Sequence, residues 1–261
     1  MRINRTTLIF MLLAGVMLCF IIMPLAKLML SSSFSSLAEA LYDHEVTKAI
    51  WLTITCALWA TLASLIFGIP LAYLLARYDF FGKRILEAIV DLPVVVPHTA
   101  AGIALLTVFG QRFLAGKLLS DVGISVVGTQ VGIAIAMAFV SAPFLINAAK
   151  EAFRMVDPKL ENAARTLGAT RWQAFRKVCL PASRKAIFSG MIMMWARGIS
   201  EFGAVIILAY HPMVAPVLIY ERFEAYGLAW ARPVAVLLLV VSLLVFGLLR
   251  AFGERASNRN A

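Results

Sequence analysis

The sequence predicts an all-α, polytopic membrane protein with six transmembrane helices. Of its 261 residues, 62% are hydrophobic and only 15% are charged, which is too apolar for a soluble domain of this size. Six apolar stretches are each long enough to cross a hydrocarbon core, which takes roughly 20 helical residues. The net charge of +10 does not indicate nucleic-acid binding, because the basic residues lie between the apolar stretches rather than on one face.

The first three spans are expected at residues 7–30, 49–76 and 85–109. The first of them lacks a convincing signal-peptidase site, so we expect it to be retained as a helix. The second contains a glycine and a proline, which membrane helices tolerate where neighbouring groups satisfy the freed backbone. Pro93 and Pro97 break the third span, so an irregular helix is expected there.

The last three spans are expected at residues 126–149, 186–209 and 233–252. The fourth is rich in glycine and alanine, which let helices approach closely in lipid. The fifth carries Arg197 and Glu201, and the sixth is uniformly apolar. Because the chain shows no internal repeat and no soluble domain, residues 1–261 are expected to form a single transmembrane domain.

The distribution of lysine and arginine orients this arrangement. Basic residues fall on the two sides of the six spans in a ratio of roughly three to one, and the richer side contains both termini and the polar segment 157–181. Since basic residues accumulate in cytoplasmic loops, we expect both termini and this segment to be cytoplasmic. The chain is therefore predicted to be a multi-pass protein of the cell membrane.

The segment 157–181 is the longest polar stretch, and its pattern predicts helix, bend, helix. Asp157 is a suitable N-cap, and Pro158 suits the first helical position. Gly168 is expected to end this first helix at a positive φ, where a β-branched residue would be strained and would crowd a close backbone contact. The apolar stripe of this helix has i, i+3, i+4, i+7 spacing and consists of Leu160, Ala163, Ala164 and Leu167.

The second helix of the segment is also amphipathic. Trp172, Phe175 and Cys179 are expected on one side of it, and Leu180-Pro181 is expected to close it. Its apolar face suits a protein partner, although a basic amphipathic hairpin lying on lipid headgroups has the same pattern.

The residues alone leave three classes of function open. The chain has no G-x-x-x-x-G-K-[S/T] phosphate loop, no zinc pattern and no nucleophile elbow. It is therefore a transport subunit driven by a separate ATPase, a secondary transporter or channel working alone, or an intramembrane enzyme using His98 and Asp91 as an acid–base pair. The missing internal repeat disfavours the second class, because self-contained secondary transporters often carry one.

One motif favours the first class. Asn162-Ala163-Ala164 is followed after three residues by Gly168, and nine residues later come Val178, Cys179 and Leu180-Pro181. This spacing resembles the cytoplasmic loop of permeases from binding-protein-dependent ATP-binding-cassette importers. Asn162 departs from the usual glutamate of that motif, Val178 replaces its isoleucine, and Glu161 lies one position early. The resemblance implies that the loop docks onto an ATPase subunit through Glu161, Asn162, Ala163, Ala164, Leu167, Gly168, Trp172, Leu180 and Pro181.

A second resemblance concerns the cargo. The stretch from Arg197 through the loop ending near residue 228, which includes SEFGAVIILAYHP, is similar to permeases of molybdate/tungstate importers and more distantly to sulfate permeases. It implies an assembly of two permease copies, two cytoplasmic ATPases that bind ATP and Mg²⁺, and an extracytoplasmic binding protein for molybdate or tungstate. This chain would be no enzyme and would hold no cofactor or metal. A sulfate or thiosulfate importer is the alternative.

Two groups of residues are candidates for contact with cargo or binding protein. His98, Arg197 and Glu201 lie at membrane depth and are assigned to the translocation pathway, although Arg197 and Glu201 are four residues apart and also suit a purely structural ion pair on one helix face. For His98 the structural alternative is a hydrogen bond to a neighbouring carbonyl. On the outside, we assign contact with the binding protein to Glu221, Arg222 and Phe223, whereas an interfacial helix anchored by Tyr226 and Trp230 would have the same composition.

Overall fold

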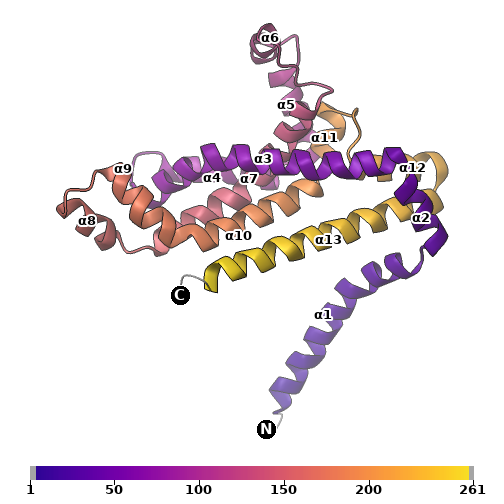
Figure 1. The fold of residues 1–261 in the computed structure, drawn as a ribbon, viewed down its shortest axis with the longest axis horizontal. Helices are drawn as coiled ribbons and strands as arrows, with labels where there is room; N and C mark the ends of the chain where they lie inside the picture. The colour runs from indigo at the N-terminus through magenta and orange to yellow at the C-terminus, as the bar shows by residue number, and fades with distance from the viewer. Residues whose placement is uncertain (1–3, 259–261) are drawn as a thin grey trace.

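The computed structural model describes residues 4–258, and every regular element in that range is a helix (Figure 1). The predicted cytoplasmic chain ends, 1–3 and 259–261, lie outside the described residues. In chain order the elements are α1 (Arg5–Leu30), α2 (Phe34–Tyr42), α3 (His44–Arg77), α4 (Lys83–Val95), α5 (His98–Phe109), α6 (Leu114–Asp121), α7 (Gln130–Met155), α8 (Pro158–Thr166), α9 (Arg171–Ala174), the π-helix η1 (Phe175–Cys179), α10 (Leu180–Ile199), α11 (Gly203–Leu208), α12 (Ala215–Tyr226) and α13 (Leu228–Asn258).

The core is a bundle in which α3, α7 and α10 pack on one another and α13 lies alongside (Figure 1). Small side chains such as Ala57, Ala60 and Ala136 are buried where these helices meet. They allow the close approach on which helix association in lipid depends. By contrast, α1 has no buried residue and stands apart from the bundle along most of its length, as a lipid-facing helix would.

Within residues 4–258, four helices are long and apolar enough to cross a membrane, namely α1, α3, α7 and α13, and the bent pair α4–α5 makes a fifth candidate if it counts as one span. These helices coincide with five of the six expected spans. The expected span 186–209 is not one helix, because α10 ends at Ile199 and α11 starts at Gly203. The number six therefore stays a prediction.

The third expected span is bent by 114° between α4 and α5. Pro97 has no N–H to continue the helical ladder, and the preceding Val96 adopts an extended ψ of 133°. The break predicted from the two prolines is confirmed at Pro97, whereas Pro93 is accommodated inside α4. As a result, α5 leaves the bundle sideways together with α6 and α11 (Figure 1).

The two ends of the bundle differ. The short helices α8 and α9 lie at one end, toward which the C-terminal part of α13 also runs, and α2 and α12 lie at the opposite end (Figure 1). The side branch of α5 and α11 leaves the bundle between them.

Candidate functional site

The end formed by α8 and α9 has the helix–bend–helix shape that its sequence predicts. Asp157 accepts a hydrogen bond from the Lys159 N–H at 2.9 Å and caps α8. At the other end the Gly168 N–H donates to Arg165 O and the Ala169 N–H donates to Ala164 O, which is a Schellman motif. Gly168 has a φ of +92°, as this motif requires. A Cβ added there would meet no atom of the described residues within 4 Å, so this chain does not itself provide the expected close backbone contact.

The second helix does not close at Leu180-Pro181 as expected. Helix α9, the π-helix η1 and α10 follow one another without a break from Arg171 to Ile199. The Leu180 N–H donates to Phe175 O, one residue further back than in an α-helix. This change of register lies directly before Pro181, so the missing proline N–H falls where the regular ladder is already interrupted.

Glu161 faces inward rather than toward a partner. Its side chain is about 10% exposed, and its Oε1 lies 2.7 Å from Arg77 Nη2. Its Oε2 accepts a 2.6 Å hydrogen bond from the Tyr73 hydroxyl. Arg77 also donates to Val156 O, so the last turns of α3 hold the start of α8 in place. We call Tyr73, Arg77 and Glu161 the anchor. The sequence reasoning missed Tyr73 and Arg77, and only their polarity at the end of an apolar span could have pointed to them.

The apolar residues of this end divide into buried and exposed groups. Phe175 and Cys179 are buried, and Phe175 packs edge-on against Tyr73 with ring centroids 4.6 Å apart. Leu160, Leu167 and Trp172 are exposed, Leu167 to 89%. Among the other residues expected to contact the ATPase, Asn162, Ala163, Gly168 and Pro181 are exposed and Ala164 and Leu180 are half-buried.

A second candidate site lies where α5 meets the break between α10 and α11. His98, Arg197 and Glu201 come together there, and we call them the central cluster. Arg197 Nη2 lies 2.9 Å from His98 Nε2 and 3.2 Å from Glu201 Oε2. His98 Nδ1 lies 3.2 Å from the same Oε2. The Glu201 side chain is fully buried, whereas His98 is 38% and Arg197 23% exposed. The predicted Arg197–Glu201 pair is confirmed.

The helix geometry proposed for that pair is wrong. Glu201 lies outside α10, in the break, and its Oε1 accepts a 2.9 Å hydrogen bond from the Ala204 N–H of α11. Gly203 makes the assembly possible, since a Cβ there would lie 2.8 Å from His98 Cβ. A buried carboxylate that caps one helix and pairs with two basic side chains therefore holds α5, α10 and α11 together.

The acid–base pair of His98 with Asp91 is not formed. Asp91 instead accepts a 2.6 Å hydrogen bond from Asn147 of α7. One turn earlier on α4, Glu87 lies 2.8 Å from Arg154 and 3.4 Å from Lys150. These polar contacts join α4 to α7.

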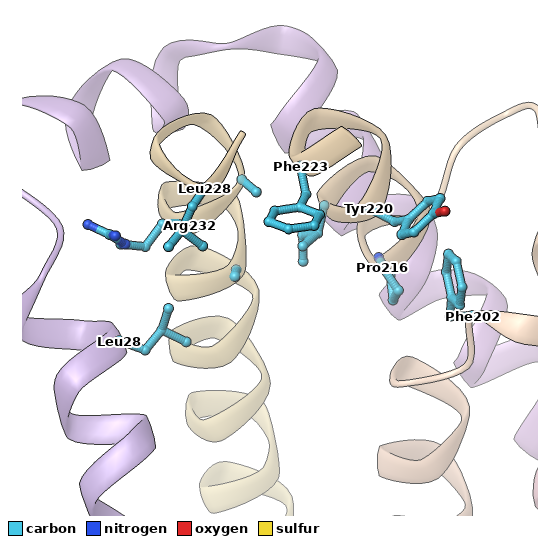
Figure 2. Close-up of a pocket in the computed structure, with 10 residues that line it drawn as sticks. Leu28, Phe202, Pro216, Tyr220, Phe223, Leu228 and Arg232 are labelled. Carbon is cyan, nitrogen blue, oxygen red and sulfur yellow. The ribbon is translucent and has the colours of Figure 1, made fainter. Parts of the chain in front are cut away.

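At the opposite end, α12 and α13 border an apolar crevice of about 280 Å³. Phe223, 48% exposed, lines it, and Phe202 and Tyr220 face each other on one side with ring centroids 5.1 Å apart (Figure 2). Leu28 from α1 and Arg232 from α13 lie on the other side (Figure 2). Tyr226 and Trp230, the candidate interfacial anchors, are both exposed, and their rings are 5.7 Å apart.

Arg222 is already engaged within the chain, and Glu221 beside it is half-buried. The Arg222 guanidinium lies 2.7 Å from Asp43 and 3.0 Å from Glu45, which ties α12 to the start of α3. Burial alone would raise the pKa of Asp43, but hydrogen bonds from Arg222 and from the Glu45 N–H outweigh it and lower that pKa. Asp43 is thus charged at neutral pH, and Arg222, which it holds, is less available to a partner than the exposed Phe223.

The family model and the relatives that match this chain are all membrane components of transport systems. Residues 68–258 match the family described as the inner membrane component of binding-protein-dependent transport systems. The chain is 44% identical over 252 residues to the molybdate/tungstate transport system permease protein WtpB of Thermococcus kodakarensis, a match that covers 96% of this chain and 97% of that protein. It is 40% identical over 201 residues to a probable sulfate transport system permease protein cysT of Chlorokybus atmophyticus, covering 75% and 70% of the two chains.

The fold also has a counterpart among solved structures. A chain of the bacterial alginate ABC transporter, in complex with its alginate pentasaccharide-bound periplasmic protein, matches with a TM-score of 0.73 over 97% of this chain and 94% of that chain. Because the two sequences are only 20% identical, this likeness concerns the fold.

Proposed function

This chain belongs to the family of binding-protein-dependent transport system inner membrane components, and on that premise we propose that it is the permease subunit of an ATP-driven importer of molybdate or tungstate. The observation that carries the proposal is the 44% identity to the WtpB permease over 96% of this chain. As a member of the family with several apolar helices, the chain is a multi-pass membrane protein.

The proposed assembly contains two copies of this chain, two cytoplasmic ATP-binding-cassette subunits and an extracytoplasmic binding protein. The alginate transporter, solved with a periplasmic protein, supports a partner of the last kind. The ATPase subunits bind ATP and Mg²⁺, and this chain supplies the pathway without a cofactor of its own. Both of its termini, and α8 and α9, face the cytoplasm.

Coupling to the ATPase is assigned to the exposed surface of α8 and α9. Leu160, Leu167 and Trp172 are exposed there among basic residues, and such apolar side chains are suited to a pocket on a partner. Glu161 acts differently from our expectation, because the anchor makes it the link between this surface and α3.

The central cluster is assigned to the translocation pathway. Arg197 offers a planar set of N–H donors suited to an oxyanion, and Glu201 keeps the site from holding a divalent anion too tightly. The side chains of Arg197 and His98 are partly exposed, whereas Glu201 is not, so an ion would meet the donors first.

Arg197→Gln is therefore expected to lower oxyanion flux about tenfold or more, since a hydrogen bond to a charged group contributes about 1.5–3 kcal/mol. ATP hydrolysis by the assembled complex should still respond to the binding protein. The measurement compares tungstate uptake and ATPase activity in proteoliposomes. Arg184→Gln, an exposed change near the other end of the same helix, is the control. Normal flux in a folded Arg197→Gln complex would remove Arg197 from the pathway.

The outer crevice is assigned to contact with the binding protein, mainly through Phe223. Phe223→Ser is expected to raise about fivefold the concentration of binding protein that half-maximally stimulates ATP hydrolysis. Phe81→Ser, at a fully exposed phenylalanine in the turn between α3 and α4, should leave that concentration unchanged. If both variants behave like the wild type, α12 is only an interfacial helix.

The cargo is tested directly. Tungstate uptake into proteoliposomes that contain this chain and its ATPase, with ATP enclosed, should require the binding protein and resist an excess of sulfate. The cysT relative gives the sulfate alternative, which would be favoured if sulfate suppressed the uptake. Uptake by this chain without the ATPase would instead make it a secondary transporter.

A further inference from the structure

One side of α10 is left uncovered by the rest of the described chain. The helix packs against α3, α7 and α13, and Trp195 is among the side chains buried in those contacts. Lys185, Ser189 and Met193 are all exposed, Met193 to 49%. They are four positions apart and therefore lie along the same side of the helix. After four more positions the row reaches Arg197 of the central cluster.

The neighbouring part of α7 is also uncovered, and it is polar. Asn147 is half-buried and donates a 2.6 Å hydrogen bond to the exposed Asp91 of α4. Glu151, four positions after Asn147, is exposed and pairs with Arg154 at 2.8 Å. The uncovered residues of the three helices, which we call the inner face, are Asp91, Asn147, Glu151, Lys185, Ser189 and Met193.

Two close contacts between α7 and α10 set the relative heights of these residues. A Cβ on Gly198 of α10 would lie 3.7 Å from the Ser141 Oγ of α7. A Cβ on Gly190 of α10 would lie 2.6 Å from the Ala148 Cβ of α7. The first contact lies next to the central cluster, and the second lies nearer the end of α7 that leads into α8.

The contacts order the uncovered residues into three levels. Arg197 is adjacent to the first contact, and Ser189 and Asn147 are each adjacent to the second. Met193 lies on α10 between the two contacts, about 6 Å along the helix axis from both Arg197 and Ser189. An exposed apolar side chain therefore separates the charged central cluster from a second polar level.

The second polar level is not suited to contact with lipid. Helix α7 has 26 residues and is about 39 Å long, so only a few ångströms at each end extend beyond a hydrocarbon core of about 30 Å. Asn147, eight positions before the end of α7 at Met155, and its partner Asp91 lie within that core. Ionisable side chains at such a depth almost always face protein or a water-filled cavity. The inner face is also continuous with Arg197, which is assigned to the pathway.

We propose that the inner face lines the cytoplasmic half of the translocation pathway, with Met193 as an apolar constriction between the central cluster and the Asn147 level. The inference rests on the proposed function of the chain as an oxyanion permease. A closed apolar ring stops a divalent anion, because the ion would lose its hydration there without gaining a partner. Beyond Met193, the Asn147 amide uses one N–H for Asp91 and keeps the second for the passing ion.

The position of Met193 also links the constriction to the ATPase surface. Helix α9, η1 and α10 are continuous from Arg171 to Ile199, so Met193 belongs to the same helical rod as the exposed Trp172. A movement of α9 that follows ATP binding or hydrolysis would therefore shift Met193 directly. The constriction is expected to close in the ATP-bound state and to open when ATP has been hydrolysed.

The first test is the accessibility of Ser189→Cys, a change of one atom that should leave the fold intact. It is made in the complete complex, with the native Cys19, Cys56 and Cys179 replaced by alanine. A charged thiol reagent on the cytoplasmic side, without ATP, should modify it about tenfold or more faster than Val16→Cys on the lipid-facing α1, since a thiol in apolar surroundings ionises poorly.

Two results of this labelling would overturn the inference. Reaction only with a membrane-soluble reagent would show that the inner face contacts lipid. A disulfide between two copies, with no labelling by the charged reagent, would show that it is a contact between copies.

The second test is a leak through Met193→Asn. With the ATPase held by a non-hydrolysable ATP analogue, tungstate should escape from loaded proteoliposomes about tenfold faster than with the wild type, which corresponds to a barrier lowered by about 1.4 kcal/mol. Met193→Leu keeps an apolar side chain of similar size and should remain tight. An assembled Met193→Asn complex that does not leak would remove the constriction. Labelled Ser189→Cys in a complex whose wild type carries no oxyanion would instead refute the proposed function and leave the lining in place.

Discussion

Gly168→Val is expected to uncouple ATP hydrolysis from transport while the chain still inserts into the membrane. The φ of +92° at this position costs an L-residue about 1–2 kcal/mol, and more when it is β-branched. The bend would then open, and the exposed Leu160 and Trp172 would lose their relative placement. A misplacement of this size should lower tungstate flux about tenfold or more.

Gly168→Asn is the matched control, because asparagine tolerates positive φ far better than valine. Since an added Cβ meets no atom of this chain within 4 Å, the comparison separates backbone strain from crowding against the ATPase. If Asn restores flux and Val does not, the bend itself is required. If both fail, the partner needs a side-chain-free surface at this point. Wild-type flux in the Val variant would contradict a docking role for the bend.

Glu161→Ala is expected to have the largest effect on stability. It would leave the Arg77 guanidinium, whose side chain is about 10% exposed, without its carboxylate, and removing one partner of a buried ion pair costs about 3–5 kcal/mol. The Tyr73 hydroxyl would lose its acceptor as well. We expect a lower thermal midpoint of the purified chain and weaker coupling, because α8 would no longer be held to α3.

A double variant separates stability from coupling. Replacing both partners of a buried pair by apolar residues is often neutral for stability, so Arg77→Met combined with Glu161→Met should regain much of the lost thermal midpoint. If the anchor transmits motion between α8 and α3, this stable variant should still hydrolyse ATP with little transport. Asp79→Asn, which removes the ion pair of the exposed Asp79 carboxylate with Lys83 in the neighbouring turn, should change neither quantity. Normal transport in the double variant would show that the anchor serves stability alone.

The sequence by itself determined those features that depend on a few neighbouring residues. The cap at Asp157 joins its side chain to a backbone N–H two positions later, and the Schellman turn at Gly168 joins backbone groups within five positions of each other, so the local sequence pattern is sufficient to predict both. The break at Pro97 follows likewise from one missing N–H. The apolar spans coinciding with α1, α3, α7 and α13 follow from composition, since only a helix satisfies its own backbone in lipid.

Only the tertiary structure decided which polar side chains meet. Glu161 turns inward because Tyr73, 88 positions earlier and in the last turns of α3, lies beside it, and Arg197 meets His98 at a separation of 99 residues. Helix α10 continues through Pro181 because the π-helix η1 lies directly before it, so the missing proline N–H falls where the backbone hydrogen bonds already change register. The break between α10 and α11 contains Glu201, whose carboxylate accepts a hydrogen bond from the first turn of α11. A buried charge costs free energy unless it is paired, so it pairs with whichever opposite charge or hydrogen-bonding group the packed helices bring within about 4 Å. The packing of helices far apart in the chain sets that distance, and no local pattern encodes it.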